Sequence, residues 1–109
     1  MEKQKFESAT VYNLKESIAI ADGGVVSKQF VKNNGGNITI FAFDKGQGLS
    51  EHTAPFDAIV QIIEGVAEVS IEGKKHEVKE GEMINMPANI PHALHATEAF
   101  KMCLIMLKG

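Results

Sequence analysis

Residues 66–80 read VAEVSIEGKKHEVKE, and apolar and polar residues alternate on both sides of Glu72-Gly73. Strict alternation is the period of a β-strand that has one buried and one solvated face. A glycine-containing pair between two such runs is typical of a hairpin turn. The stretch therefore predicts an antiparallel β-hairpin, with Glu68, Ser70 and Glu72 on its solvated face.

Short runs rich in Val, Ile, Phe and Thr continue on both sides of this hairpin, separated by glycine and asparagine. Such spacing predicts many short strands joined by turns. The predicted strands are residues 25–32, 37–43, 58–64, 66–72, 75–79, 82–86, 92–97 and 100–107. The first twenty residues leave three alternatives open: an edge strand, a short helical turn, or a segment exchanged with a second subunit.

The fold class follows from these strands. Many short strands without a predicted helix call for a sandwich or a barrel, because closure protects the strand edges. The chain has 109 residues and no linker or composition break, so residues 1–109 are expected to form one domain with one core. We predict an all-β fold, a single closed antiparallel β-barrel or jelly roll.

Composition excludes several classes of partner. Eleven Lys and Arg against 14 Asp and Glu give a net charge of -3 without a basic block, which argues against nucleic acid. No apolar run approaches the ~20 residues that span a bilayer, and the start lacks a signal-peptide core. We therefore expect no membrane partner and a cytoplasmic location. Cys103 lies in an apolar run without a cysteine partner and is expected to be buried.

Two blocks carry polar residues at a distinctive spacing. The first covers about 46–65 and contains Gly46, His52, Asp57 and Gly65; the second covers about 81–96 and contains Gly81, Pro87, Asn89 and His92. Together they resemble the paired motifs of the cupin superfamily in order and spacing, over about half of the chain. The resemblance implies a cupin fold, the double-stranded β-helix, for the whole domain.

The departures from the family pattern concern the metal ligands. Metal-binding cupins use two histidines and a glutamate of the first motif and one histidine of the second. This chain keeps His52 and His92, but Ala54 stands at the second histidine and Asp57 near the glutamate. A strict register points at Ala58 instead of Asp57.

The resemblance implies a metal site of His52, His92 and Asp57 for a divalent ion: zinc, iron, manganese or nickel. If Asp57 points inward, strand alternation places Gln61 on the same face as a fourth candidate group. His76 and His95 are expected to be solvated. A set of apolar residues could line a pocket, but core positions are expected for most of them: Phe41, Phe43, Phe56, Ile63, Met83 and Met86.

Three functions remain open. The first is a metal-dependent enzyme acting on a small organic substrate, with the reaction unassigned. The second is a binding module that holds a small-molecule ligand without metal, which the loss of histidine at Ala54 favours. The third is a sensor or assembly domain, because the resemblance also implies a homodimer.

Overall fold

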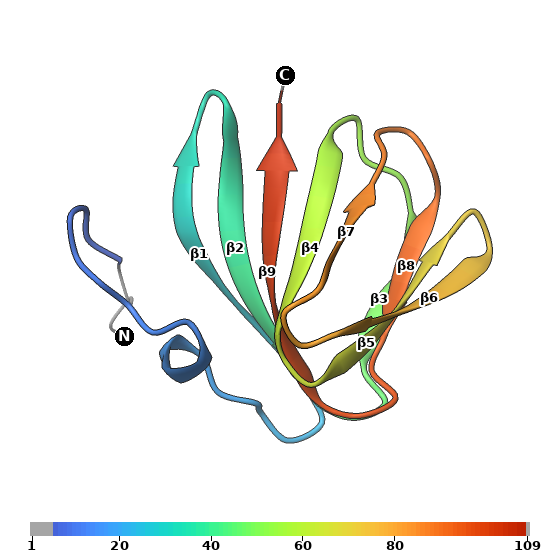
Figure 1. Cartoon of the computed structure of the whole chain (residues 1–109), viewed down its shortest axis with the longest axis horizontal. Coiled ribbons are helices and arrows are strands. Elements are labelled where there is room, and N and C mark those ends of the chain that lie inside the picture. Colours follow the sequence, from blue (N-terminus) through green and yellow to red (C-terminus); the bar gives the residue numbers. More distant parts are fainter. Residues whose placement is uncertain (1–5, 109) are drawn as a thin grey trace.

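The computed structural model describes residues 6–108 and consists of strands packed as two antiparallel sheets, with one short helix (Figure 1). The elements are η1 (Lys15–Ser17), β1 (Val25–Asn33), β2 (Gly36–Phe43), β3 (Gly48–His52), β4 (Asp57–Glu64), β5 (Val66–Ile71), β6 (Lys74–Lys79), β7 (Met83–Met86), β8 (His92–His95) and β9 (Phe100–Leu107). No helix in this part of the chain is long and apolar enough to cross a membrane.

The two sheets have the orders β1-β2-β9-β4-β7 and β3-β8-β5-β6. The C-terminal strand β9 lies at the centre of the larger sheet, between β2 and β4. Within the described chain no ladder joins one sheet to the other, so the prediction of a closed barrel is wrong in that respect. The architecture is a two-sheet jelly roll, which confirms the predicted all-β fold class.

The main core lies between the inner faces of the two sheets. It is formed by buried residues from both sheets: Phe43, Ala58, Val60, Ile62, Ala67, Val69, Val78, Met86, Leu94, Ala96, Phe100 and Met102. Strand alternation explains their spacing, because every second residue of β4 and β5 points inward. The predicted outward face of Glu68, Ser70 and Glu72 is confirmed, since the residues between them point into the core.

Each predicted strand has a counterpart in the structure, which adds one strand that the sequence did not predict, β3 (Gly48–His52). Gly46-Gln47-Gly48 marks a turn, but the strand begins at Gly48 itself. A Cβ atom at Gly48 would lie 2.3 Å from the carbonyl oxygen of Leu94 on β8. Here glycine permits close pairing of two backbones and does not end a strand.

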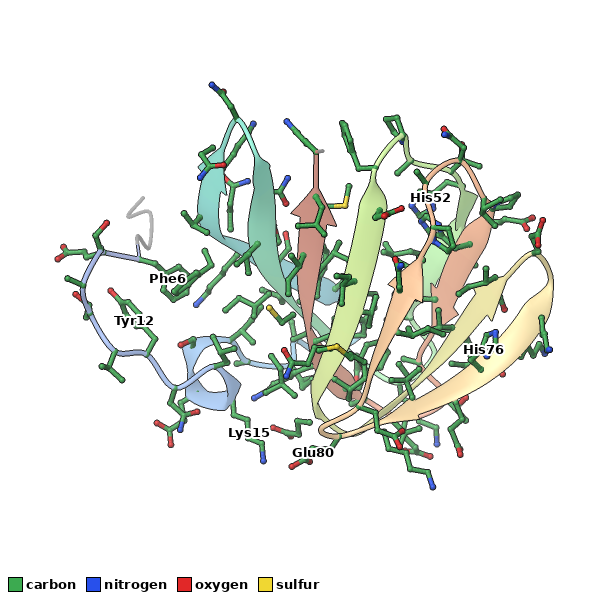
Figure 2. The ribbon with its side chains drawn as sticks, turned by 45° about the horizontal axis from the view of Figure 1, so that its top comes forward. Phe6, Tyr12, Lys15, His52, His76 and Glu80 are labelled. Carbon is green, nitrogen blue, oxygen red and sulfur yellow. The ribbon has the colours of Figure 1, made fainter. Side chains whose placement is uncertain are left out.

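Residues 6–24 cover part of the outer face of the larger sheet. The short helix confirms one of the three alternatives for this segment. The Lys28 and Lys101 ammonium groups donate to the backbone oxygens of Ser17 and Lys15, at 2.8 and 2.7 Å. Phe6 and Tyr12 pack edge to face beside β1, with ring centroids 4.8 Å apart (Figure 2).

The outer face also hides a second group of apolar side chains. Ile18, Ile40, Ala42 and Cys103 are buried, yet they do not belong to the core between the sheets. Burial raises the pKa of the Cys103 thiol, so the thiol stays protonated and unreactive. The predicted buried cysteine is confirmed. Among the residues proposed for the core, Phe43 and Met86 are buried, but Met83 is 60% exposed.

Candidate functional site

His52 and His92 lie side by side at one end of the jelly roll. They are paired across β3 and β8, and their ring centroids are 4.5 Å apart at an interplanar angle of 73°. Figure 2 shows His52 at the opposite end of the strands from Lys15 and Glu80. His92 is buried and His52 is exposed, so the pair spans the boundary between interior and solvent.

The backbone fixes the orientation of both rings. The Nδ1 atom of His52 lies 2.6 Å from the carbonyl oxygen of Ser50, and Nδ1 of His92 lies 3.1 Å from that of Ile90. A carbonyl oxygen accepts but cannot donate, so each neutral ring carries its proton on Nδ1. The Nε2 lone pair of each imidazole is then free to accept a hydrogen bond or to bind a metal ion.

Electrostatics keep His92 in its neutral form, which has a lone pair on one ring nitrogen. Burial lowers the pKa of His92 below its usual value of 6.5, and the nearby His52 lowers it further. The hydrogen bond to Ile90 opposes these effects but does not reverse them. His92 is therefore neutral at neutral pH.

A small cavity of about 70 Å³ lies against the two rings. Its lining comes from both sheets and from the loop after β3: Leu49, His52, Ala54, Ala58, Met86, His92, Leu94, Leu104 and Met106. Apart from the two imidazoles, the side chains of this lining are aliphatic groups and thioethers. The cavity therefore presents two nitrogen acceptors in a mostly apolar surrounding.

Asp57 and Gln61 lie on the other face of β4 from this cavity. In β4 the buried positions are Ala58, Val60 and Ile62, which face the core. Alternation turns Asp57 and Gln61 outward, so the structure does not bring them to the histidine pair. The strict register of the motif, which pointed at Ala58, describes the position that lines the cavity.

Asp57 holds the loop that precedes His92 through a backbone hydrogen bond. Its Oδ1 atom accepts a hydrogen bond of 2.9 Å from the backbone N–H of Ala88. In the same loop, the N–H of Asn89 donates to the oxygen of Ala54 at 2.7 Å, and Asn89 has a φ of 63°. These bonds tie the loop before His92 to the loop after His52, so Asp57 positions the site without entering it.

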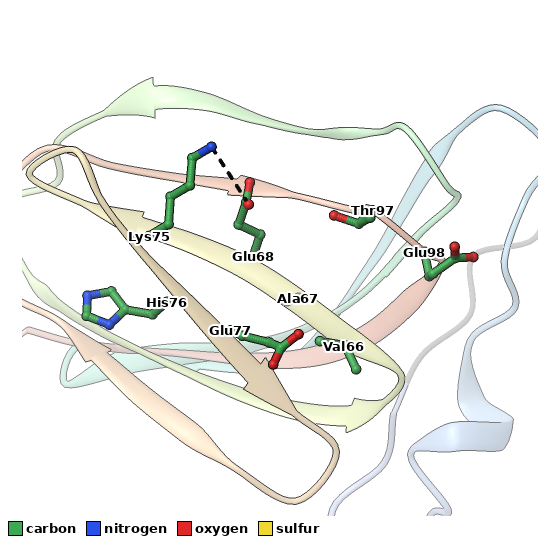
Figure 3. A pocket seen from close by; sticks show the side chains of 8 residues that line it. All are labelled: Val66, Ala67, Glu68, Lys75, His76, Glu77, Thr97 and Glu98. Carbon is green, nitrogen blue, oxygen red and sulfur yellow. Dashed lines mark ion pairs between the residues drawn. The ribbon is translucent and has the colours of Figure 1, made fainter.

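The other two histidines lie elsewhere. His95 is exposed on the outer face of β8, as predicted. His76 is half-buried and lines a hollow of about 410 Å³ with residues of the β5–β6 hairpin and the loop after β8. Figure 3 shows Lys75 of this hollow directed toward Glu68, an ion pair of 4.0 Å. Because these charged groups pair with each other or face solvent, we place the candidate site at the histidine pair.

Sequence reasoning missed Met106 as a lining residue, because it lies in a run that is apolar almost throughout. Met86 is among the residues that could line a pocket, although a core position is favoured for most of that set. The pairing register of β4 with its two neighbours explains their position, because Met86 on β7 and Met106 on β9 both pair with Ala58 on β4. The neighbouring strands could not be known before the strand order was known.

Comparisons with known proteins agree with this architecture. The family model of the cupin domain matches residues 39–108. A conserved protein of unknown function from Streptococcus pyogenes is 40% identical, with a TM-score of 0.90 over 97% of this chain and 93% of that one. A cupin superfamily protein from Desulfitobacterium hafniense is 22% identical, with a TM-score of 0.88 and full coverage of both chains, and shows the fold alone.

A further solved structure is longer. The cupin 2 conserved barrel domain protein from Leptotrichia buccalis is 43% identical with a TM-score of 0.86, and the match covers 89% of this chain but 47% of that protein. The search of curated proteins gave no significant match. The family model covers both motif blocks and most of the strands that build the two sheets. The chain therefore belongs to the cupin domain family.

Proposed function

We propose that this cupin binds a small ligand beside His52 and His92, at the mouth of the cavity, assisted by a metal ion held at the two Nε2 atoms. The observation that supports the proposal is the histidine pair itself. Two Nδ1–H groups are directed at backbone oxygens, which leaves two lone pairs available beside an apolar cavity. The reaction, if the ligand is a substrate, stays unassigned.

The donor groups at this site fit a metal ion only in part. Two imidazoles suit zinc, iron, manganese or nickel, the divalent ions implied by the resemblance. The two-histidine, one-carboxylate set does not fit, because Asp57 points away from the cavity. Among the described residues no group of three or more His, Cys, Asp or Glu side chains could hold a metal ion. The remaining positions would go to water, to the ligand or to a softer donor.

Elemental analysis of the untagged protein tests the proposal. Near-stoichiometric metal per chain is expected for the wild type, and His52→Ala and His92→Ala are each expected to lose it, because a single imidazole is a poor site. His95→Ala, an exposed histidine on the same strand as His92, is the matched control and should keep the metal. Thermal unfolding checks that each variant folds.

Two results would contradict the proposal. Metal that is retained in both His52→Ala and His92→Ala would lie elsewhere in the chain. A wild type that binds neither divalent ions nor Cu(I) at micromolar concentrations would leave a binding module without metal. That alternative is favoured by Ala54, which replaces a family histidine at the cavity wall.

We also propose that two copies of the chain pair through the outer face of the larger sheet. Ile38, Ile105 and Ile59 form one row across β2, β9 and β4, and none of them belongs to the core between the sheets. Val31 of β1 continues this row and is 45% exposed. Aligned apolar side chains on a solvated sheet face support a protein interface.

Light scattering after gel filtration tests this pairing. A dimer mass is expected for the wild type, and a monomer for Ile105→Lys, because the ammonium group would stand in the middle of the apolar row. Lys74→Ala on the distant β6 is the control and should stay dimeric. A monomeric wild type, or a dimeric Ile105→Lys, would show that this face is not the interface.

A further inference from the structure

The two methionines of the cavity form a wall opposite to the two histidines. Ala58 on β4 pairs with Met86 on β7 and with Met106 on β9, and all three line the cavity. Residues paired across antiparallel strands point to the same face of the sheet. The small Ala58 side chain therefore lies between two thioethers, and both belong to the larger sheet. His52 and His92 belong to the smaller sheet.

The donor atoms at this cavity are soft. Among the described residues, the side chains that line it provide two imidazole nitrogens and two thioether sulfurs, and no carboxylate, hydroxyl or amide. Thioether sulfur selects Cu(I), imidazole suits copper as well as zinc, and magnesium, calcium and manganese prefer oxygen ligands. A set of two nitrogens and two sulfurs therefore discriminates in favour of a monovalent copper ion.

The size and polarity of the cavity point the same way. A cavity of about 70 Å³ holds no more than a few waters, since each water needs roughly 10–15 Å³ of such volume. The remaining walls include Leu49, Leu94 and Leu104. Desolvating an ion costs energy that grows with the square of its charge, so an apolar cavity disfavours a divalent ion more than a monovalent one.

We infer that this cavity is a Cu(I) site in which Nε2 of His52, Nε2 of His92 and the sulfurs of Met86 and Met106 are the ligands. The inference rests on the proposed function, because it assigns the ion and two further ligands to the same cavity. It also assigns a role to Met86, which is 2% exposed and is otherwise a packing residue. Ala54 and Ala58 contribute space on the cavity wall without adding a donor.

Competition titrations under anaerobic, reducing conditions test the inference. The untagged full chain is titrated with Cu(I) against a chromophoric Cu(I) chelator, and separately with Zn²⁺ and Ni²⁺. One Cu(I) per chain is expected, bound more tightly than either divalent ion. Met86→Leu and Met106→Leu are each expected to weaken Cu(I) by about tenfold or more, since even the partners of metal ligands change affinity 10–100-fold when removed.

Matched variants separate ligation from packing. Leucine has nearly the volume of methionine, and such swaps in a core usually cost under about 1.5 kcal/mol, so both variants are expected to fold. Met102→Leu is the control, because Met102 is buried in the core but does not line the cavity. Its Cu(I) affinity should equal that of the wild type. Sulfur scattering at copper in the X-ray absorption spectrum should weaken in the two cavity variants alone.

The possible failures are distinguishable. Zinc or nickel bound as tightly as Cu(I), with affinities that depend on both histidines and ignore both methionines, would overturn the Cu(I) inference and leave the histidine site intact. Failure of all three ions to bind would overturn the Cu(I) inference, and if iron and manganese also fail to bind it would overturn the metal site of the proposed function. Cu(I) binding that survives in His52→Ala and His92→Ala would overturn both as well, because the ion would then lie elsewhere.

Discussion

Gly65→Ala is expected to destabilise the fold by roughly 2–5 kcal/mol, through a left-handed backbone and a direct steric clash. Gly65 joins β4 to β5 with a φ of +84°, and a Cβ atom there would lie 2.6 Å from the oxygen of Ala99 and 3.0 Å from Cβ of Phe100. The left-handed conformation costs an alanine about 1–2 kcal/mol, and overpacking adds about 1–3 kcal/mol. Equilibrium urea unfolding measures the loss.

Gly81→Ala is the matched control for this variant. Gly81 has a φ of +87°, and a Cβ atom there would meet nothing within 4 Å. Its substitution should cost the conformational part alone, about 1–2 kcal/mol. The difference between the two variants then measures the clash at the β4–β5 turn. Equal losses would show that the chain between β8 and β9 moves aside without cost, and that the close approach has no structural importance.

The fold could be predicted from the sequence because its signals are local. Alternation over residues 66–80 defines β5 and β6, and apolar runs define β4 and β9. These patterns depend on the burial of one or both faces of each strand, which a single sequence records. The strand order, and the absence of pairing between the two sheets, depend on contacts between segments that are distant in the chain. A single sequence carries no direct record of such contacts.

The site could be predicted in part for the same reason. His52 and His92 stand at the family spacing, and the structure brings them together. Asp57 is the only acidic residue near the family position of the carboxylate, but successive residues of a strand point to opposite faces of the sheet. A shift of one residue therefore moves a group from the cavity to solvent. Met86 and Met106 needed the register of three strands before they could be placed.

The aromatic core and the histidine cavity lie in different parts of the fold, so substitutions can affect stability and binding separately. The aromatic side chains of Phe43 and Phe100 stack with centroids 4.7 Å apart, and neither lines the histidine cavity. Phe43 ends β2 and Phe100 begins β9, whereas His52 ends β3 and Met106 lies near the end of β9. A loss of packing at the aromatic pair should therefore change the fraction of folded protein more than the affinity of the folded form.

Phe100→Ala is expected to destabilise the protein by about 3–5 kcal/mol, the usual cost of removing a large core aromatic. Phe100 is 0% exposed, stacks on Phe43 and packs beside the Gly65 turn, so neighbouring groups cannot collapse freely into the space. Phe56→Ala is the control, because Phe56 is half-buried and lies near Lys108 in a loop; it should lose less than Phe100→Ala. Since small domains have total stabilities of about 5–15 kcal/mol, Phe100→Ala should unfold well below the wild type in thermal and urea denaturation. A loss no greater than that of Phe56→Ala would show that the stacked pair is not the centre of the core.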